Sequence, residues 1–262
     1  MLSVIARLTL YVGVAVALGE VALQYTEDND STHHRVRDGR KTAVVGWCIA
    51  VLGVLLLVVA QARDMELSSL PELRTVVTQT TWGRGWSVLA SSTLLGLVVT
   101  VLGTSRLLRA VCAIAVGVAM GGLGHAAADE SWPIVARALD ASHVLASGIW
   151  IGGLFLVMQR QRSTRNKPTV ANDRASWLAL SRMATIAAPV VVLSGIGAAW
   201  RRLSGATVSM VVASDYGRLL AVKIALAVVV LWYGFTHRRR VNSGAIPSCV
   251  ISDSKSFSKW LE

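Results

Sequence analysis

Charged residues are scarce in this sequence. They make up 16% of its 262 residues, whereas hydrophobic residues make up 53%, and an ordinary soluble domain carries roughly 25% charged residues. The apolar residues are gathered in blocks long enough to cross the hydrocarbon core of a bilayer, which takes about 20 residues of helix. This pattern excludes a soluble globular domain and predicts an all-α, polytopic bundle of membrane helices.

Seven apolar blocks are predicted to span the membrane, with short connections between them. Arg7 precedes an apolar stretch in the first block, as in a signal peptide, but the block continues without a clear cleavage motif and we expect it to be retained. The seven blocks are residues 4–25, 43–62, 86–104, 107–128, 134–158, 183–200 and 217–236.

Cysteine is also scarce, and motifs for catalysis are absent. Cys48, Cys112 and Cys249 form neither a CxxC pair nor a disulfide framework, and we expect them to be free thiols. The sequence shows no activated nucleophile, no acid–base pair and no nucleotide-binding loop. It therefore predicts a protein that is not an enzyme.

Basic residues predict how the chain crosses the membrane. The net charge is +11, and 17 of the 26 lysines and arginines lie after the first, third, fifth and seventh blocks. Because Lys and Arg are enriched in cytoplasmic loops, these connections are expected inside and the N-terminus outside. His33 and His34 lie in the first of these charged connections and are interpreted as solvated surface.

A short pattern occurs twice in the chain. Residues 210–220, MVVASDYGRLL, resemble residues 76–86, VVTQTTWGRGW, and each copy precedes a predicted span. Aromatic and basic side chains suit the headgroup interface, so we interpret the pattern as an anchor that is used twice, with a nearby lysine that reaches outward. The predicted anchors are Trp82, Arg84, Tyr216, Arg218 and Lys223.

The repetition extends beyond this pattern. Residues 6–23 align loosely with residues 136–153, which divides a transmembrane domain of residues 1–240 into halves of about 1–108 and 135–240. An eighth helix would complete the duplication. Residues 241–262 are too polar to provide it and are predicted to form a cytoplasmic tail.

Four ionisable residues within the predicted spans, Glu20, His125, His143 and Lys223, are singled out as candidates for function, because burying an ionisable group in a membrane is costly. Glu20 and Lys223 lie at different predicted depths and are not expected to pair. His125 and His143 are each nine residues from Ile134, where consecutive antiparallel helices are expected to turn. The two histidines are therefore predicted at one depth, near the outer face.

Helical spacing supports a common site. Gly117, Gly121 and His125 share one helix face, whose small residues would let another helix approach closely. In the next span, Ser147 and Trp150 follow the second histidine on one face. The site is predicted to bind a metal or, alternatively, to form hydrogen bonds between helices.

Copper is the favoured metal for the histidine pair. Neutral imidazole binds copper and haem iron alike. Met120 offers a soft sulfur on the same side, although its helical angle to His125 is about 140° and packing is the alternative. The predicted metal ligands are His125, His143 and Met120.

Three segments resemble those of the CopD-type copper-resistance membrane proteins. Residues 143–154, HVLASGIWIGGL, resemble the family's HxxAxxxWxGGL signature. Residues 124–126 are similar to its GHA element, and residues 216–223 are similar to its YGRLLxxK segment. The resemblance covers roughly residues 80–240, in the order and spacing of the family.

This resemblance implies a bacterial inner-membrane protein of about eight helices that handles copper for resistance or homeostasis, often beside a periplasmic copper-binding protein. The leading hypothesis is copper transport: the two histidines take up the ion outside and pass it along the face of Trp150, Gly152 and Gly153. The alternatives are a haem-binding electron-transfer protein and a copper-delivery factor for cytochrome oxidase assembly. The expected partners are copper, membrane lipid and such a periplasmic or assembly protein, and no nucleic acid.

Overall fold

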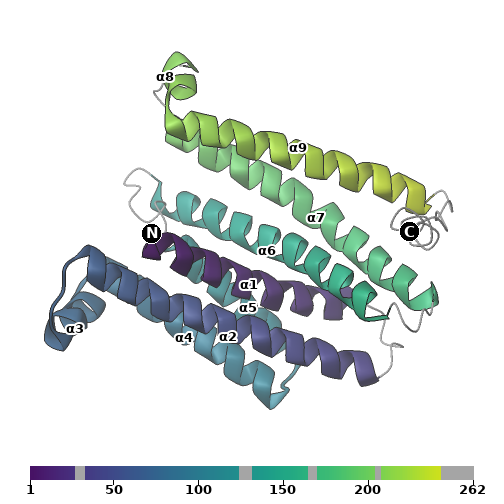
Figure 1. The fold of residues 1–262 in the computed structure, drawn as a ribbon, viewed down its shortest axis with the longest axis horizontal. Helices are drawn as coiled ribbons and strands as arrows, with labels where there is room; N and C mark the ends of the chain where they lie inside the picture. The colour runs from purple at the N-terminus through teal and green to yellow at the C-terminus, as the bar shows by residue number, and fades with distance from the viewer. Residues whose placement is uncertain (27–32, 124–131, 165–169, 204–207, 243–262) are drawn as a thin grey trace, which may run out of the picture. The chain divides into compact units, whose positions relative to one another are not determined.

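The computed structural model describes residues 1–26, 33–123, 132–164, 170–203 and 208–242, and all regular structure in these ranges is α-helical. The chain divides into two compact units, Met1–Arg202 and Leu203–Glu262, which are described separately. The helices are α1 (Leu2–Thr26), α2 (His33–Asp64), α3 (Leu70–Gln79), α4 (Thr81–Leu102), α5 (Arg106–Gly121), α6 (Pro133–Thr164), α7 (Val170–Leu203), α8 (Val208–Ala213) and α9 (Asp215–Asn242) (Figure 1).

The predicted class of fold is confirmed. Five helical stretches in the described ranges are long and apolar enough to cross a membrane, and they correspond to five of the seven predicted spans. The predicted span 107–128 falls on α5, where the described helix ends at Gly121, and the predicted span 217–236 falls within α9. The five are Leu2–Thr26, Gly39–Asp64, Thr81–Leu102, Pro133–Arg160 and Trp177–Arg201.

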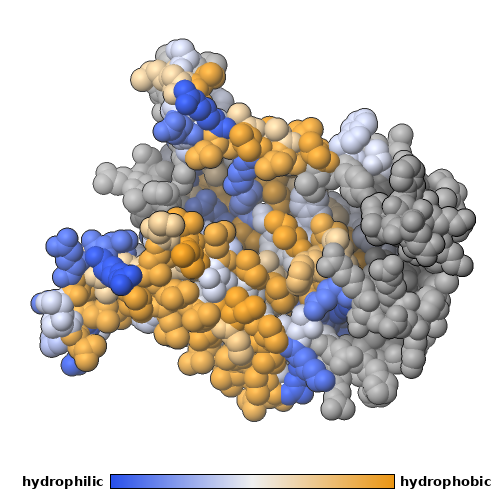
Figure 2. Space-filling view, viewed as in Figure 1, coloured by the Kyte–Doolittle hydropathy of each residue, from blue (hydrophilic) through white to orange (hydrophobic). Residues whose placement is uncertain are grey.

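The outer surface of the first unit is apolar along its helices. Figure 2 shows a continuous hydrophobic surface over α2 and α4, with hydrophilic residues gathered near α3 and toward the other end of these helices. Large apolar side chains such as Leu52, Leu55, Leu94 and Leu95 are more than half exposed. This distribution is typical of helices that face lipid.

Helix α1 lies at the centre of the first unit and packs against α2, α5 and α6 (Figure 1). Glycines bring the backbones of α1 and α2 together: a Cβ atom on Gly13 would lie 2.3 Å from the Ala50 nitrogen, and one on Gly53 would lie 2.4 Å from the Leu10 nitrogen. The core around this contact contains Leu10, Val14, Leu18, Trp47, Val54, Leu89, Val116 and Met120.

Several helices extend beyond the apolar blocks that predicted them. Helix α2 begins at His33 and not at residue 43, and α6 continues to Thr164 and not to residue 158. His33 and His34 therefore belong to a helix and not to a loop, and Arg160 belongs to a helix also. The reason is physical: an apolar block marks the part of a helix that lies in lipid, whereas the backbone hydrogen bonds continue into water.

Helix α3 was not among the predicted elements, although its start is readable in the sequence. The Ser69 hydroxyl accepts a bond from the Glu72 amide, and the Glu72 carboxylate accepts one from the Ser69 amide, which is a capping box followed by Pro71 in the first turn. Hydrogen bonds, first of all from the Ser68 amide, hold the pKa of Glu72 below its usual value.

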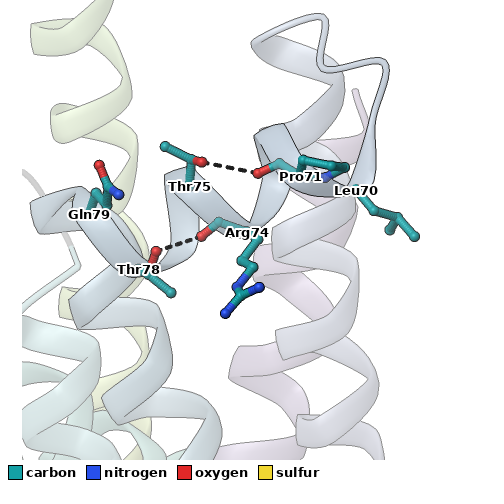
Figure 3. A pocket seen from close by; sticks show the side chains of 6 residues that line it. All are labelled: Leu70, Pro71, Arg74, Thr75, Thr78 and Gln79. Carbon is teal, nitrogen blue, oxygen red and sulfur yellow. Dashed lines mark hydrogen bonds between the residues drawn. The ribbon is translucent and has the colours of Figure 1, made fainter.

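The polar face of α3 borders a hollow of about 710 Å³ (Figure 3). The hydroxyls of Thr75 and Thr78 donate to the carbonyls of Pro71 and Arg74, at 3.0 and 2.8 Å, and so are used within the helix. Val76, on the other face, is buried. The helix is therefore amphipathic, with its polar face outward.

Candidate functional site

His143 projects from α6 toward α7. Its ring Nδ1 lies 3.1 Å from the Val191 carbonyl oxygen and 3.1 Å from the Ser194 hydroxyl, and the residue is half-buried. A Cβ on Gly195 would lie 3.4 Å from the His143 ring, so the glycine allows close contact. Val191 and Ser194, which follow His143 by 48 and 51 positions in the sequence, thus fix the orientation of its imidazole.

The partners of His143 assign its tautomer. A carbonyl oxygen only accepts, so the contact with Val191 calls for a proton on Nδ1, and in the neutral imidazole the lone pair is then on Nε2. The Ser194 hydroxyl itself donates into α7, to Val190 or Val191. A metal-binding histidine is usually held in this way, with one nitrogen bonded to the protein and the other basic.

The glycines of the same motif have packing contacts with two other helices. A Cβ on Gly152 would lie 1.8 Å from the Ala15 carbonyl oxygen of α1, and one on Gly19 would lie 2.4 Å from the Gly152 carbonyl carbon. Gly153 faces Met183 of α7, whose methyl group would lie 2.5 Å from an added Cβ. Ser147 and Trp150 are half-buried on α6.

Helix α5 packs on α6 through its small residues, as its sequence predicts. A Cβ on Gly117 would lie 2.3 Å from the Leu145 side chain, and one on Gly121 would lie 2.8 Å from the Arg137 carbonyl oxygen. Met120 is buried within the hydrophobic core, at 8% exposure. His125 lies outside the described residues, and within those described no group of three His, Cys, Asp or Glu side chains could hold a metal.

A hollow of about 350 Å³ lies between α6 and α7, lined almost entirely by apolar surface. Its lining includes Ser142, the neighbour of His143, and Met183, whose sulfur accepts a hydrogen bond of 3.4 Å from the Thr26 hydroxyl. The remaining lining residues are Thr26 of α1 and Leu145, Ala146, Ile149, Arg182, Ile186, Ala187 and Val190.

Glu20 forms an ion pair that the sequence did not predict. Its side chain is 1% exposed, and both carboxylate oxygens lie 2.9 Å from Nη2 of Arg160, on α6. Gln24 donates a further bond of 3.3 Å. Arg160 follows the apolar block of α6 and therefore resembles a loop residue in sequence. Only the extension of the helix brings it to Glu20.

The two copies of the short pattern have the same local geometry, each within its own unit. The Thr80 hydroxyl accepts from the Gly83 amide at 2.9 Å, and the Ser214 hydroxyl accepts from the Gly217 amide at 3.0 Å. Each hydroxyl also donates a bond of 2.7 Å to a carbonyl of the preceding short helix. Both positions require glycine, because a carbonyl oxygen of the preceding short helix lies where a Cβ atom would be. It is that of Val76 for Gly83 and that of Val211 for Gly217.

The predicted anchors lie near these caps. Trp82 stacks on Trp86, with ring centroids 6.5 Å apart, and the Trp86 indole donates to the Val54 carbonyl at 3.0 Å. Arg218 forms an exposed ion pair of 3.7 Å with Asp215. Three more of the predicted anchors are exposed, namely Arg84, Tyr216 and Lys223.

These features define the class of the protein, a polytopic helical membrane protein with a buried ion pair and an oriented histidine. The model of the copper resistance protein D-like N-terminal domain matches residues 1–135, and that of copper resistance protein D matches residues 175–247. The chain belongs to the copper resistance protein D family. His125 lies within the first match, whereas His143 lies between the two. No curated protein and no solved structure matches the chain.

Proposed function

We propose that this protein carries copper ions across the bacterial inner membrane, as a transporter and not as an enzyme, and that His143 binds the ion near the outer face. The observation that carries the proposal is the bond from Nδ1 of His143 to the Val191 carbonyl. In the neutral ring this bond leaves Nε2 as the basic nitrogen, which would bind the ion. Membership of a copper-resistance family supports copper as the substrate.

His125 is proposed as the second ligand, because it is nine residues from the predicted turn, as is His143. Two neutral imidazoles suit copper in either common oxidation state. Met120 is the weaker candidate for a third ligand, because its side chain is buried in the core of the first unit. It would reach the ion only if α5 rotated.

From this site the ion would pass inward along α6. Ser147 and Trp150 continue the face of His143, whereas Gly152 and Gly153 are occupied by contacts with α1 and α7. We therefore propose that the glycines position α6 and that the hydroxyl and indole border the path. The net direction would be uptake, in cooperation with a periplasmic copper-binding protein.

Purified protein tests the copper site directly. His143→Ala should lose most of the bound copper, and Ser194→Ala should lose part of it because the ring keeps only one of its two fixed partners. His34→Ala is the matched control, since it removes a histidine from the first turn of α2, at the opposite side of the predicted topology. Unchanged copper content in His143→Ala would refute the proposal.

The same preparation decides between copper and haem. A Soret absorbance band that disappears in His143→Ala would show that the histidine binds haem iron, and the protein would then be an electron carrier. A strain lacking the protein separates transport from delivery. Transport predicts lower cellular copper content, whereas delivery to an oxidase predicts normal copper content with lost oxidase activity.

A further inference from the structure

The hollow between α6 and α7, here called the α6–α7 groove, lies between two regions where these helices touch. On the predicted cytoplasmic side, Leu156 of α6 and Leu180 of α7 belong to one buried cluster. On the outer side, His143 bonds to Val191 and Ser194. The groove occupies the length between these contacts, where α6 and α7 leave a space of about 350 Å³.

The dimensions of the groove favour a narrow occupant. Its lining on α7 runs from Arg182 to Val190, which is about 12 Å at the helical rise of 1.5 Å per residue. A volume of about 350 Å³ over this length gives a mean cross-section of about 30 Å². A helix with its side chains is about 10–12 Å across and has a cross-section of at least about 80 Å². The groove is therefore too narrow for a helix of a second copy and suits one extended acyl chain.

The surface of the groove is hydrocarbon. Ala146 and Ala187 are buried small residues that leave room between the helices, whereas Ile186 is 74% exposed and borders the opening at the surface of the first unit. The hydroxyl of Thr26 is already used, since it donates to the Ala22 carbonyl at 3.1 Å. An ion in the groove would lose its hydration without gaining ligands, so the groove suits an apolar molecule.

The groove has the depth of one leaflet. Arg182 immediately precedes the predicted span 183–200, and Thr26 immediately follows the predicted span 4–25, so both mark the predicted cytoplasmic boundary of the hydrocarbon. The hydrocarbon of one leaflet is about 15 Å thick, half of the bilayer core, and the groove extends about 12 Å inward from this boundary. An acyl chain of the cytoplasmic leaflet would therefore lie in it along most of its length.

Arg182 gives the cytoplasmic end of the groove a positive charge. Its side chain is exposed, and among the described residues no carboxylate forms an ion pair with it. A guanidinium can donate two parallel hydrogen bonds to the oxygens of a phosphodiester. Anionic headgroups are concentrated at the cytoplasmic surface, where they attract basic side chains. Charge complementarity therefore favours an anionic phospholipid over a neutral one.

We infer that an anionic phospholipid binds in the α6–α7 groove, with its phosphate at Arg182 and one acyl chain between the helices as far as Val190. The chain fills the space that separates α6 from α7. It thereby supports the contact of His143 with α7, which begins at the next residue, Val191.

A photoreactive phosphatidylglycerol tests this inference. The full chain is reconstituted in phosphatidylcholine discs that contain a small fraction of phosphatidylglycerol with a diazirine in the middle of one acyl chain. After illumination, mass spectrometry locates the adducts, which should be concentrated on residues 142–149 of α6 and 183–190 of α7. Excess unlabelled phosphatidylglycerol should remove these adducts, whereas the same excess of phosphatidylcholine should leave most of them.

Variants that fill the groove show whether the acyl chain lies there. Ala187→Leu and Ala146→Leu fill it from opposite helices, and each should remove most of the labelling, so that either one serves if the other does not fold. Ala138→Leu adds the same group at an exposed position of α6 and should be labelled as the wild type is.

A second pair of variants tests the headgroup. Arg182→Gln should reduce the preference for phosphatidylglycerol over phosphatidylcholine by about fivefold, which is the effect of one basic residue at an anionic surface. Arg63→Gln, which changes an exposed arginine at the outer end of α2, is the matched control and should keep the full preference.

The inference is overturned if the exposed faces of α2 and α4 are labelled as densely as the groove, or if both groove-filling variants retain the labelling. Equal competition by the two lipids would also overturn it, because Arg182 would then not select the headgroup. Crosslinks between two copies of the chain at these residues would show a protein occupant instead. These measurements contain no copper and are therefore independent of the proposed role of His143.

Discussion

The Glu20 carboxylate in α1 and the Arg160 guanidinium in α6 are joined at 2.9 Å across 140 residues of sequence. Breaking one side of a buried ion pair typically costs about 3–5 kcal/mol, because the remaining charge is left without a partner. We therefore predict that Glu20→Ala and Arg160→Ala each lower the free energy of unfolding in detergent by about 3 kcal/mol, and that the double variant costs less than the sum.

Asp215→Ala is the control for this prediction. It breaks an exposed pair with Arg218, 3.7 Å apart, and should change the free energy of unfolding by less than about 1 kcal/mol. Additive losses in the double variant would show that Glu20 and Arg160 do not stabilise each other.

The histidines are predicted to act as one copper site. His125→Ala and His143→Ala should each abolish copper binding to a similar degree, and the double variant should be little worse, because residues that act as a unit are not additive. Copper content of the purified variants is the measurement. Independent, additive losses would indicate two successive sites along a path.

Gly152 is predicted to resist any side chain. Gly152→Ala would place a Cβ atom 1.8 Å from the Ala15 carbonyl oxygen, and this contact can be relieved only by separating α1 from α6. Overpacking of this kind costs about 2 kcal/mol.

Gly234→Ala is the matched control in α9, since nothing lies within 4 Å of its added Cβ. It should be neutral or stabilise its helix by about 0.5–1 kcal/mol. Equal melting temperatures for Gly152→Ala and Gly234→Ala would contradict the close packing of α1 and α6.

The caps of α4 and α9 are predicted to contribute equally. Thr80→Ala and Ser214→Ala each remove the acceptor of a glycine amide, and each should cost about 1 kcal/mol. Thr80→Ser and Ser214→Thr, which keep the hydroxyl, are the controls. A loss in only one of the two alanine variants would mean that the shared geometry has different importance in the two units.

The topology can be tested with reporters. Because 17 of the 26 basic residues lie on one side, a fusion after residue 165 and another after residue 240 should both be cytoplasmic. Fluorescence of a green fluorescent protein fusion checks this. Alkaline phosphatase activity at either position would place that position in the periplasm and refute the predicted orientation.

The spans could be predicted because lipid imposes a simple rule: every crossing needs an unbroken apolar stretch. The small-residue face of α5 could be predicted for a related reason, since Gly117 and Gly121 recur every four residues. Helices outside the lipid carry no such signal. The capping box of Ser69 and Glu72 is readable in the sequence, but α3 is short and this cap is the one sequence signal that predicts it.

The partners in the site could not be predicted from the sequence. His143 meets Val191 and Ser194 because α6 and α7 are antiparallel neighbours, and one backbone carbonyl resembles any other in sequence. Glu20 pairs with Arg160 because α6 continues beyond the end of its apolar block. Predicting these two contacts would require knowing where α6 ends and which helix it packs against. Composition gives neither.

The Glu20–Arg160 pair also constrains how the protein is made. When α1 leaves the ribosome, it carries an acidic group whose counter-charge will be synthesised 140 residues later. Until then Gln24, one turn away on the same helix, is the partner at hand. Helix α1 therefore enters the bilayer before the Glu20 carboxylate has its arginine partner. Its packing is complete only after α6 has been inserted. A nascent chain arrested before α6 should accordingly be a substrate for membrane quality-control proteases, whereas one arrested after all of α6 has left the ribosome should be protected.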